Sequence, residues 1–134
     1  MKIRIVSGEV NKKTGPVRDI VVDIEYLDVA METGTEFEHD IKKGNRAFAY
    51  VIEGSGYFDS EKKRNIGKEH LVIFKDGDNV KIAANDTVLQ FLLISGKPLG
   101  EPVAWRGPIV MNTQEELQVA FDEYRNGTFI KHKI

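Results

Sequence analysis

The chain has 134 residues, of which 41% are hydrophobic and 30% charged, and its formal net charge is −2 at pH 7. This length fits one domain, so we predict a single domain over residues 1–134. The sequence contains no cysteine, which excludes disulfides, thiolate metal ligands and cysteine nucleophiles. Its short basic pairs lie in turn-like segments near acidic residues, unlike the concentrated positive charge of nucleic-acid-binding proteins. We therefore expect no nucleic-acid partner.

The N-terminus alternates between charged and apolar residues and lacks the apolar core of a signal peptide. No apolar run approaches the ~20 residues that a membrane-spanning helix needs. We expect a cytoplasmic protein that does not contact a membrane.

Most of the sequence before Pro98 is typical of short β-strands separated by turns. In chain order, the predicted strands are 3–6, 20–29, 35–41, 47–52, one that begins at 57–58, 71–74, 80–84 and 88–95. Residues 7–16 and 59–68 are expected to be loops. Many short strands with turns between them indicate an all-β sandwich or barrel.

Alternating side chains indicate which residues share a face of these strands. In the strand 20–29 the alternation falls on Ile20, Val22, Ile24 and Tyr26. In the strand 35–41, Phe37, His39 and Ile41 share one face and acidic residues occupy the other. In the strand 47–52, small alanines alternate with Phe48, Tyr50 and Ile52, which leaves room for close packing or for a ligand.

The end of the sequence predicts a long connector followed by one helix. Glycines and prolines make residues 95–112 a connecting loop. Thr113-Gln114-Glu115-Glu116 fits a capping box, in which the first and last residues satisfy each other's backbone amides. Apolar residues then recur at helical spacing at Leu117, Ala120, Phe121 and Tyr124. A helix of about twelve residues is marginal alone in water, so this stripe must pack on the domain or on a second copy.

Four segments of the sequence together resemble the second cupin of the pirin family. They are residues 5–16, 49–54, 91–103 and 107–113, the last being the most specific. The resemblance covers nearly the whole chain. It implies an all-β cupin, a double-stranded β-helix or jelly-roll barrel, with one C-terminal α-helix. In pirins the first cupin holds the metal and this second cupin completes the protein.

The resemblance also implies that the family's metal site is missing here. The metal-bearing cupin of pirins has a His-x-His pair shortly before its Tyr-Val-x-x-Gly strand, and a later His and Glu. At the same distance before Tyr50 this sequence has Asp40-Ile41-Lys42. A protonated lysine has no lone pair for a metal, and residues 71–84 contain no His-x-Glu. We expect no metal ligand and no cofactor, so the residues do not support the family's iron binding or flavonol dioxygenase activity.

The three histidines are the remaining candidates for chemistry. His39 is expected to be interior or half-buried, whereas His70 and His132 are expected to be exposed. A nonstandard metal site that joins His39 and His70 to Glu36, Glu38 or Glu69 is an open alternative. We identify no catalytic residue. If the cupin mouth holds a ligand, the candidate ligand-binding residues are His39, Tyr50 and Gln90. Trp105 is expected to anchor the connector or to contact a partner.

The leading functional hypothesis is a metal-free, pirin-like cupin that forms a homodimer and acts as a binding or structural module. The closing helix or its connector would lie in the interface. One alternative is a small cupin metalloenzyme, a dioxygenase or isomerase, that uses His39 and His70. A second alternative is half of a split pirin, which would pair with a separate metal-binding cupin.

Overall fold

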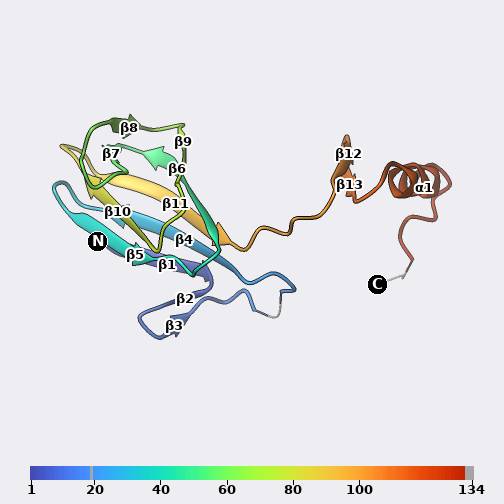
Figure 1. The fold of residues 1–134 in the computed structure, drawn as a ribbon, viewed down its shortest axis with the longest axis horizontal. Helices are drawn as coiled ribbons and strands as arrows, with labels where there is room; N and C mark the ends of the chain where they lie inside the picture. Colours follow the sequence, from blue (N-terminus) through green and yellow to red (C-terminus); the bar gives the residue numbers. More distant parts are fainter. Residues whose placement is uncertain (19, 132–134) are drawn as a thin grey trace. The chain divides into compact units, whose positions relative to one another are not determined.

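The computed structural model describes residues 1–18 and 20–131. In this part of the chain, many strands precede one C-terminal helix (Figure 1). The strands are β1 (Lys2–Ser7), β2 (Glu9–Val10), β3 (Lys13–Thr14), β4 (Ile24–Met31), β5 (Glu36–Asp40), β6 (Arg46–Glu53), β7 (Ser55–Tyr57), β8 (Asn65–Gly67), β9 (Leu71–Ile73), β10 (Asn79–Ala84), β11 (Leu89–Gly96), β12 (Ala104–Arg106) and β13 (Ile109–Met111). The helix α1 spans Gln114–Arg125. The chain divides into two compact units, Met1–Pro98 and Leu99–Ile134.

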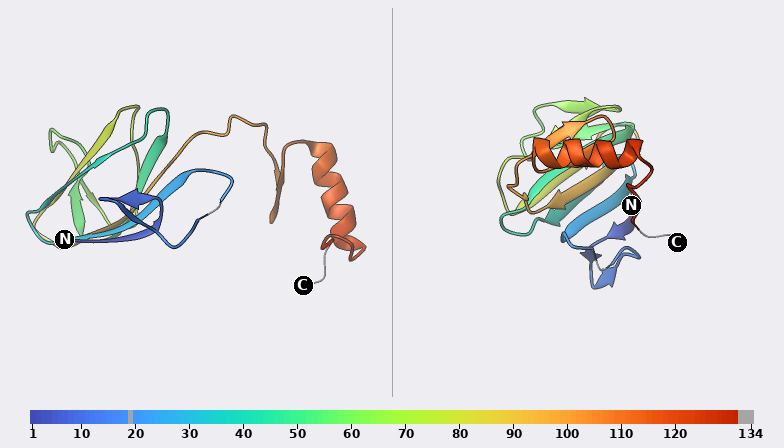
Figure 2. Two further views of the ribbon diagram at one scale, coloured as in Figure 1. Left: turned by 90° about the horizontal axis from the view of Figure 1, so that it is seen from below. Right: turned by 90° about the vertical axis from the view of Figure 1, so that its right-hand side faces the viewer.

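The first unit consists of two antiparallel sheets and a small hairpin. The order of strands is β1-β4-β11-β6-β9 in the larger sheet and β5-β10-β7-β8 in the smaller one. Between β4 and β11 the chain passes repeatedly from one sheet to the other, which is the connectivity of a jelly roll; Figure 2 shows the two sheets from two further sides. The all-β prediction is confirmed. Among the described residues the sheets stay separate, so they form a sandwich rather than one closed hydrogen-bonded barrel.

The core of this unit lies between the two sheets. β4 and β11 supply fully buried residues such as Leu27, Val29 and Phe91 from the larger sheet. Phe37 on β5 meets Phe91 edge-on, with ring centroids 5.8 Å apart. Burial of such side chains contributes about 1.5–3 kcal/mol each, so this interior holds the sheets together.

The predicted strand 20–29 differs from β4 in both its start and its face. β4 begins at Ile24, and its buried residues are Leu27, Val29 and Met31. Apolar residues occupy both alternating sets in this segment, so the pattern alone does not choose between them. Pairing with β11 places Leu27 opposite Leu93 and Val29 opposite Phe91, and this decides which set is buried.

Segments predicted to be loops contain short hairpins. β2 and β3 pair within residues 7–16 around Asn11 and Lys12, which both have positive φ. Two such residues are the requirement of a type I′ hairpin turn. Likewise β8 lies within 59–68, and β12 pairs with β13 inside the connector 95–112. Strands of two or three residues are too short to show an alternating pattern, which explains why the sequence pattern missed them.

The second unit carries the predicted helix with its cap. The amide of Glu116 donates to Thr113 Oγ1 at 3.2 Å, and the amide of Thr113 donates to Glu116 Oε2 at 3.0 Å. Leu117 and Ala120 are buried against the hairpin residues Ala104 and Ile109. Over the described residues, no helix is long and apolar enough to cross a membrane. Because the chain divides into two compact units, the expectation of a single domain over residues 1–134 stays a prediction.

Gly54 offers a sharp test of the larger sheet. Its φ is +73°, and a Cβ atom there would lie 1.7 Å from the carbonyl oxygen of Val88. Gly44 also has a positive φ, +86°, but a Cβ atom there would meet nothing within 4 Å. We expect Gly44→Ala to cost about 1–2 kcal/mol of unfolding free energy from left-handed strain alone.

We expect Gly54→Ala to cost more than about 3 kcal/mol, because the backbone clash adds to the same strain. Urea unfolding followed by circular dichroism measures both variants. Equal losses would contradict the close approach of Val88 to Gly54.

Candidate functional site

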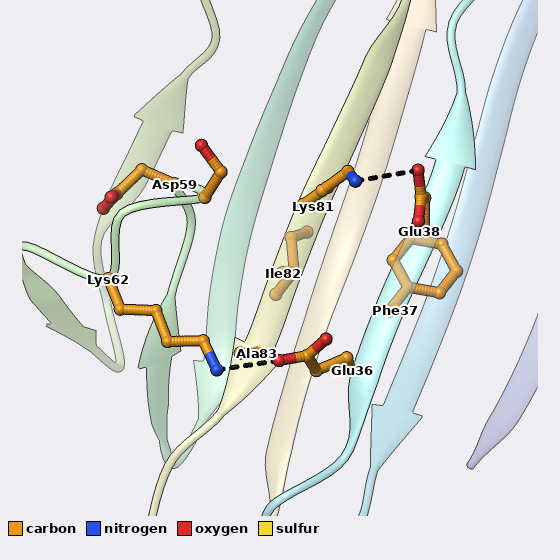
Figure 3. Close-up of a pocket in the computed structure, with 9 residues that line it drawn as sticks. Glu36, Phe37, Glu38, Asp59, Lys62, Lys81, Ile82 and Ala83 are labelled. Carbon is orange, nitrogen blue, oxygen red and sulfur yellow. Dashed lines mark hydrogen bonds and ion pairs between the residues drawn. The ribbon is translucent and has the colours of Figure 1, made fainter.

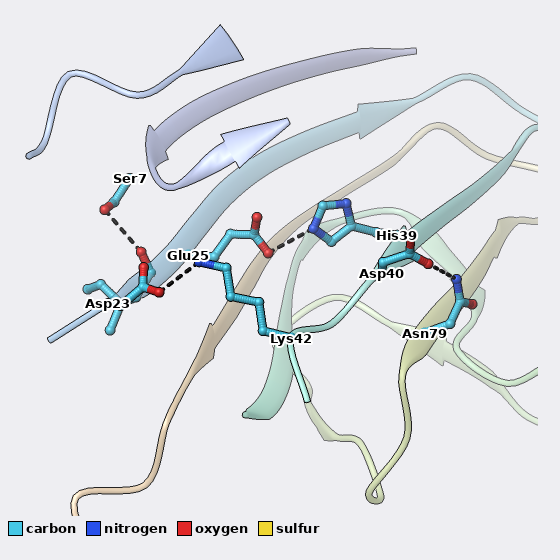
Figure 4. Close-up of polar contacts among 8 residues, drawn as sticks. Ser7, Asp23, Glu25, His39, Asp40, Lys42 and Asn79 are labelled. Carbon is cyan, nitrogen blue, oxygen red and sulfur yellow. Dashed lines mark hydrogen bonds and ion pairs between the residues drawn. The ribbon is translucent and has the colours of Figure 1, made fainter. Parts of the chain in front are cut away.

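The candidate site is the mouth of the sandwich, where one side chain from each sheet meets. His39 on β5 and Glu25 on β4 lie with Nε2 and Oε2 2.7 Å apart (Figure 4). Their side chains are only 13% and 15% exposed. A carboxylate can only accept a hydrogen bond, so the imidazole donates. The pair therefore joins the two sheets at the edge of the core.

His39 is held on a second side by the core. Its ring stacks on Phe37, with centroids 5.8 Å apart and an interplanar angle of 11°. Phe37 contacts Phe91, and Phe91 contacts Phe58, so aromatic rings run from the mouth into the interior. The half-buried position predicted for His39 is what the structure shows. Among the described residues, its second ring nitrogen has no hydrogen-bond partner.

A cavity of about 500 Å³ lies beside this pair. It is lined by residues 9–11 of the β2–β3 hairpin, Glu25, residues 38–40 and Lys42. Four of the eight lining residues, Glu9, Glu25, Glu38 and Asp40, are acidic, so the cavity suits a small polar molecule rather than an apolar one.

Two further polar contacts fix the residues around the cavity. Lys42 donates to Asp23 Oδ2 at 2.7 Å, and Asn79 donates to Asp40 Oδ1 at 3.1 Å (Figure 4). The hydrogen bond to Asp23 raises the pKa of Lys42, although partial burial opposes this. The Lys42 amine therefore stays protonated.

The residues at this mouth do not match the metal site found in the metal-bearing cupin of the family that the sequence resembles. Lys42 is a protonated ion-pair partner, and Asp40 is engaged by Asn79. Residues 1–18 and 20–131 contain no group of three or more His, Asp or Glu side chains that could hold a metal ion. His70 is exposed and hydrogen-bonds through Nδ1 to the carbonyl of Lys68, whereas His39 pairs with Glu25. His132 lies outside the described residues.

The structure does not bring the three predicted ligand-binding residues together. His39 faces the space between the sheets, while Tyr50 and Gln90 lie on the outer face of the larger sheet. Gln90 donates to Asp28 Oδ1 at 2.9 Å, and Arg4 donates to Asp28 Oδ2 at 2.8 Å. Burial raises the pKa of Asp28, but these two hydrogen bonds outweigh it and the net pKa is lowered.

Glu25 is the site residue that sequence reasoning missed. The prediction followed Ile24 and Tyr26, which are on the other set of alternating positions. Glu25 shares its set with Leu27 and Val29, which are fully buried. The sequence signal for Glu25 was an acidic residue at the same alternating positions as a run of buried apolar residues. Reading that signal required knowing which face of β4 is buried.

The outer face of the larger sheet is apolar over its central strands. The register places Tyr50 between Leu92 and Leu71, and Phe48 between Ile94 and Ile73. On the edge strand Ile73 is 76% exposed and Leu71 55%, and Tyr50 is 40% exposed. We call this surface the sheet-face patch, made of Phe48, Tyr50, Leu71, Ile73, Leu92 and Ile94.

The outer face of the smaller sheet has the opposite character. A cavity of about 350 Å³ there is bordered by two ion pairs, Lys62–Glu36 at 2.7 Å and Lys81–Glu38 at 3.2 Å (Figure 3). The hydrogen bond from Lys62 lowers the pKa of Glu36. The outer face of the smaller sheet is therefore charged, and that of the larger sheet is apolar.

The second unit has an apolar surface of its own. A cavity of about 460 Å³ is lined by residues 108–111 of the hairpin together with Phe121, Tyr124 and Phe129. The rings of Tyr124 and Phe129 meet edge-on, with centroids 6.4 Å apart. We call this surface the C-terminal groove. The side chain of Trp105, on β12, is exposed. Its indole N–H donates to the carbonyl of Gly107 at 2.7 Å, a contact within the β12–β13 hairpin.

Comparison with known proteins identifies the family of this chain. The sequence profile of the Pirin C-terminal cupin domain matches residues 26–130. The chain belongs to the pirin family. Pirin-1 of Arabidopsis thaliana is 36% identical over 129 residues, which cover 94% of this chain and 45% of that protein. Human pirin is 37% identical over 103 residues, which cover 75% of this chain and 36% of that protein.

A solved structure with the same fold supports the cupin architecture. The crystal structure of quercetin 2,3-dioxygenase from Acinetobacter baumannii superposes with a TM-score of 0.86 at 22% identity, over 95% of this chain and 43% of that one. At this identity the similarity establishes the cupin fold alone. The chain spans about half the length of the curated pirins it matches.

The contact between His39 and Glu25 predicts a measurable coupling. We expect Glu25→Ala and His39→Ala each to lower the unfolding free energy by about 1–3 kcal/mol, because each leaves a half-buried polar partner unsatisfied. The double variant should lose less than the sum, with a coupling above about 0.5 kcal/mol.

The matched control is the exposed pair of Asp23 and Lys42, for which we expect a coupling smaller than that of His39 and Glu25 and screened by salt. Chemical denaturation of both sets of variants gives the two couplings. A coupling at the mouth no larger than that of the exposed pair would contradict its structural importance.

Proposed function

We propose that this pirin-family cupin acts as a metal-free, homodimeric binding or structural module. The observation that carries this proposal is the sheet-face patch, which places exposed leucine, isoleucine and tyrosine side chains side by side on one sheet. A contiguous exposed apolar patch usually marks an interaction site. The cytoplasmic location remains part of the same proposal.

The contrast between the outer faces supports an interface on the larger sheet. The smaller sheet presents lysines paired with glutamates, which are well solvated and costly to desolvate. The larger sheet presents aromatic and branched apolar side chains, and removing these from water is favourable. Tyr50 therefore becomes a candidate interface residue instead of a ligand-binding residue.

The binding role is assigned to the mouth cavity with His39 as its central residue. Glu25 and Phe37 hold the imidazole in one orientation, and its free ring nitrogen is available to a small polar ligand. Gln90 supports Asp28 on the far side of the sheet and does not belong to this site. We assign no catalytic residue.

A related arrangement pairs this chain with a different cupin. The chain spans about half the length of its relatives, so a separately encoded metal-binding cupin is a partner of suitable size. The same sheet-face patch would serve that interface. Co-purification of such a cupin in place of a homodimer distinguishes this split pirin from the leading proposal.

Dimerisation through the patch gives a direct prediction. We expect wild-type protein to be a dimer by light scattering, and Ile73→Glu to weaken the dimer by about tenfold or more, since a charge buried in an apolar interface is costly. The sheet should remain intact because the Ile73 side chain is exposed.

Val21→Glu is the control, since Val21 is fully exposed and lies outside the sheets. It should leave the dimer unchanged, and circular dichroism should show the same fold for both variants. A wild-type chain that remains monomeric at high concentration would refute the homodimer.

The alternative is a metalloenzyme, and one relative favours it. A Thermoplasma acidophilum protein, provisionally named a quercetin 2,3-dioxygenase, is 35% identical over 144 residues, covering 98% of this chain and 52% of that protein. This chain matches only about half of that protein's length. Here the reaction would require a nonstandard site around His39 and His70.

Elemental analysis separates the two functions. We expect well under one metal ion per chain, both as isolated and after anaerobic incubation with iron, because the described side chains offer no group of three ligands. One tightly held ion per chain, lost in a His39→Ala/His70→Ala variant but kept in Lys63→Ala, would favour the metalloenzyme.

A further inference from the structure

The second unit is too small to account for its own stability. It spans Leu99–Ile134, and its core consists of four buried residues, Ala104, Ile109, Leu117 and Ala120. Units below about 40 residues normally need disulfides, metals or association in order to fold. The chain has no cysteine, and the described residues offer no metal cluster. This unit therefore needs a further apolar surface to pack against.

The C-terminal groove is the face through which it would pack. Tyr124 is 67% exposed at one side of the groove, and Val110 is exposed at the other. Phe121, another lining residue, is half-buried, and the Arg106 guanidinium lies 5.2 Å from its ring centroid. An aromatic floor with a basic residue at its margin has the composition of a protein interface, where aromatic residues and arginine are enriched.

We propose that the C-terminal groove of one copy packs on the sheet-face patch of a second copy, and that the second copy does the same in return. This inference rests on the proposed homodimer and specifies its geometry. Each chain carries two apolar surfaces, one on each unit. In a dimer with two-fold symmetry, the groove of each copy packs on the patch of the other. Both grooves and both patches are then buried, and neither surface is left to bind a third copy. A sheet-on-sheet dimer would bury the patch but leave both grooves in water.

The connector between the units is compatible with this exchange. Residues 97–103 contain Pro98 and Pro102, which favour extended backbone at the residues before them. The structure describes all seven of these residues, and no backbone hydrogen bond closes a reverse turn among them. Asn112 hydrogen-bonds to Glu101 and to the carbonyl of Pro102 within the second unit, so the free connector is residues 97–100, which span up to about 14 Å.

Site-directed cross-linking tests the pairing in the full-length chain. Because the protein has no cysteine, Ile73→Cys in the patch and Tyr124→Cys in the groove each introduce a unique thiol. The two single variants, distinguished by mass, are mixed, allowed to exchange subunits and treated with a short bismaleimide. We expect the mixed Ile73→Cys with Tyr124→Cys product to predominate over either homodimeric product. Asp86→Cys, an exposed turn residue outside both surfaces, should not cross-link to Tyr124→Cys.

The double variant Ile73→Cys/Tyr124→Cys identifies which copy the groove contacts. Covalent dimers on a denaturing gel support the exchange, whereas a cross-linked monomer would show the groove packing on its own sheet and would overturn it. Predominant Ile73→Cys homodimers would overturn it in favour of a sheet-on-sheet contact. Light scattering of the wild-type protein separates the two proposals. A monomer refutes both, and a dimer without the mixed cross-link refutes the exchange alone.

Discussion

The pairing of β11 with both β4 and β6 is the constraint on which the rest of the structure depends. As the central strand of the larger sheet, β11 fixes the register of its neighbours on either side. Alternation then places Leu93 between the sheets and Leu92 outside them. The same register turns Glu25 inward to meet His39 and turns Tyr50 outward to the sheet-face patch. One set of backbone hydrogen bonds therefore positions both the mouth and the apolar face.

The sequence predicted elements wherever a local signal was strong. The capping box at Thr113 and the alternation around Phe37 are local, and both reappear in the structure. The family resemblance supplied the jelly roll, which local pattern alone left as a sandwich or a barrel. What could not be predicted depended on partners distant in sequence. The buried face of β4 was ambiguous, so Glu25 was missed, and Tyr50 and His39 were grouped although opposite faces separate them.

The polar side chains at the mouth of the sandwich hold the structure together. His39 bonds to Glu25, and Lys42 bonds to Asp23, so these polar side chains tie together β4, β5 and the segments beside them. These pairs hold the mouth of the sandwich together through contacts between the chain's own side chains. A small polar cavity remains beside them.

The shortness of β9 has a consequence for the solubility of the unassembled chain. This edge strand has three residues, and two of them, Leu71 and Ile73, are exposed and apolar. Long apolar edges recruit further strands and lead to aggregation, and proteins restrain them with short strands and flanking lysines. Lys68 and Lys75 lie on either side of β9. The chain thus exposes an apolar surface at this edge without offering enough unpaired backbone to template a fibril.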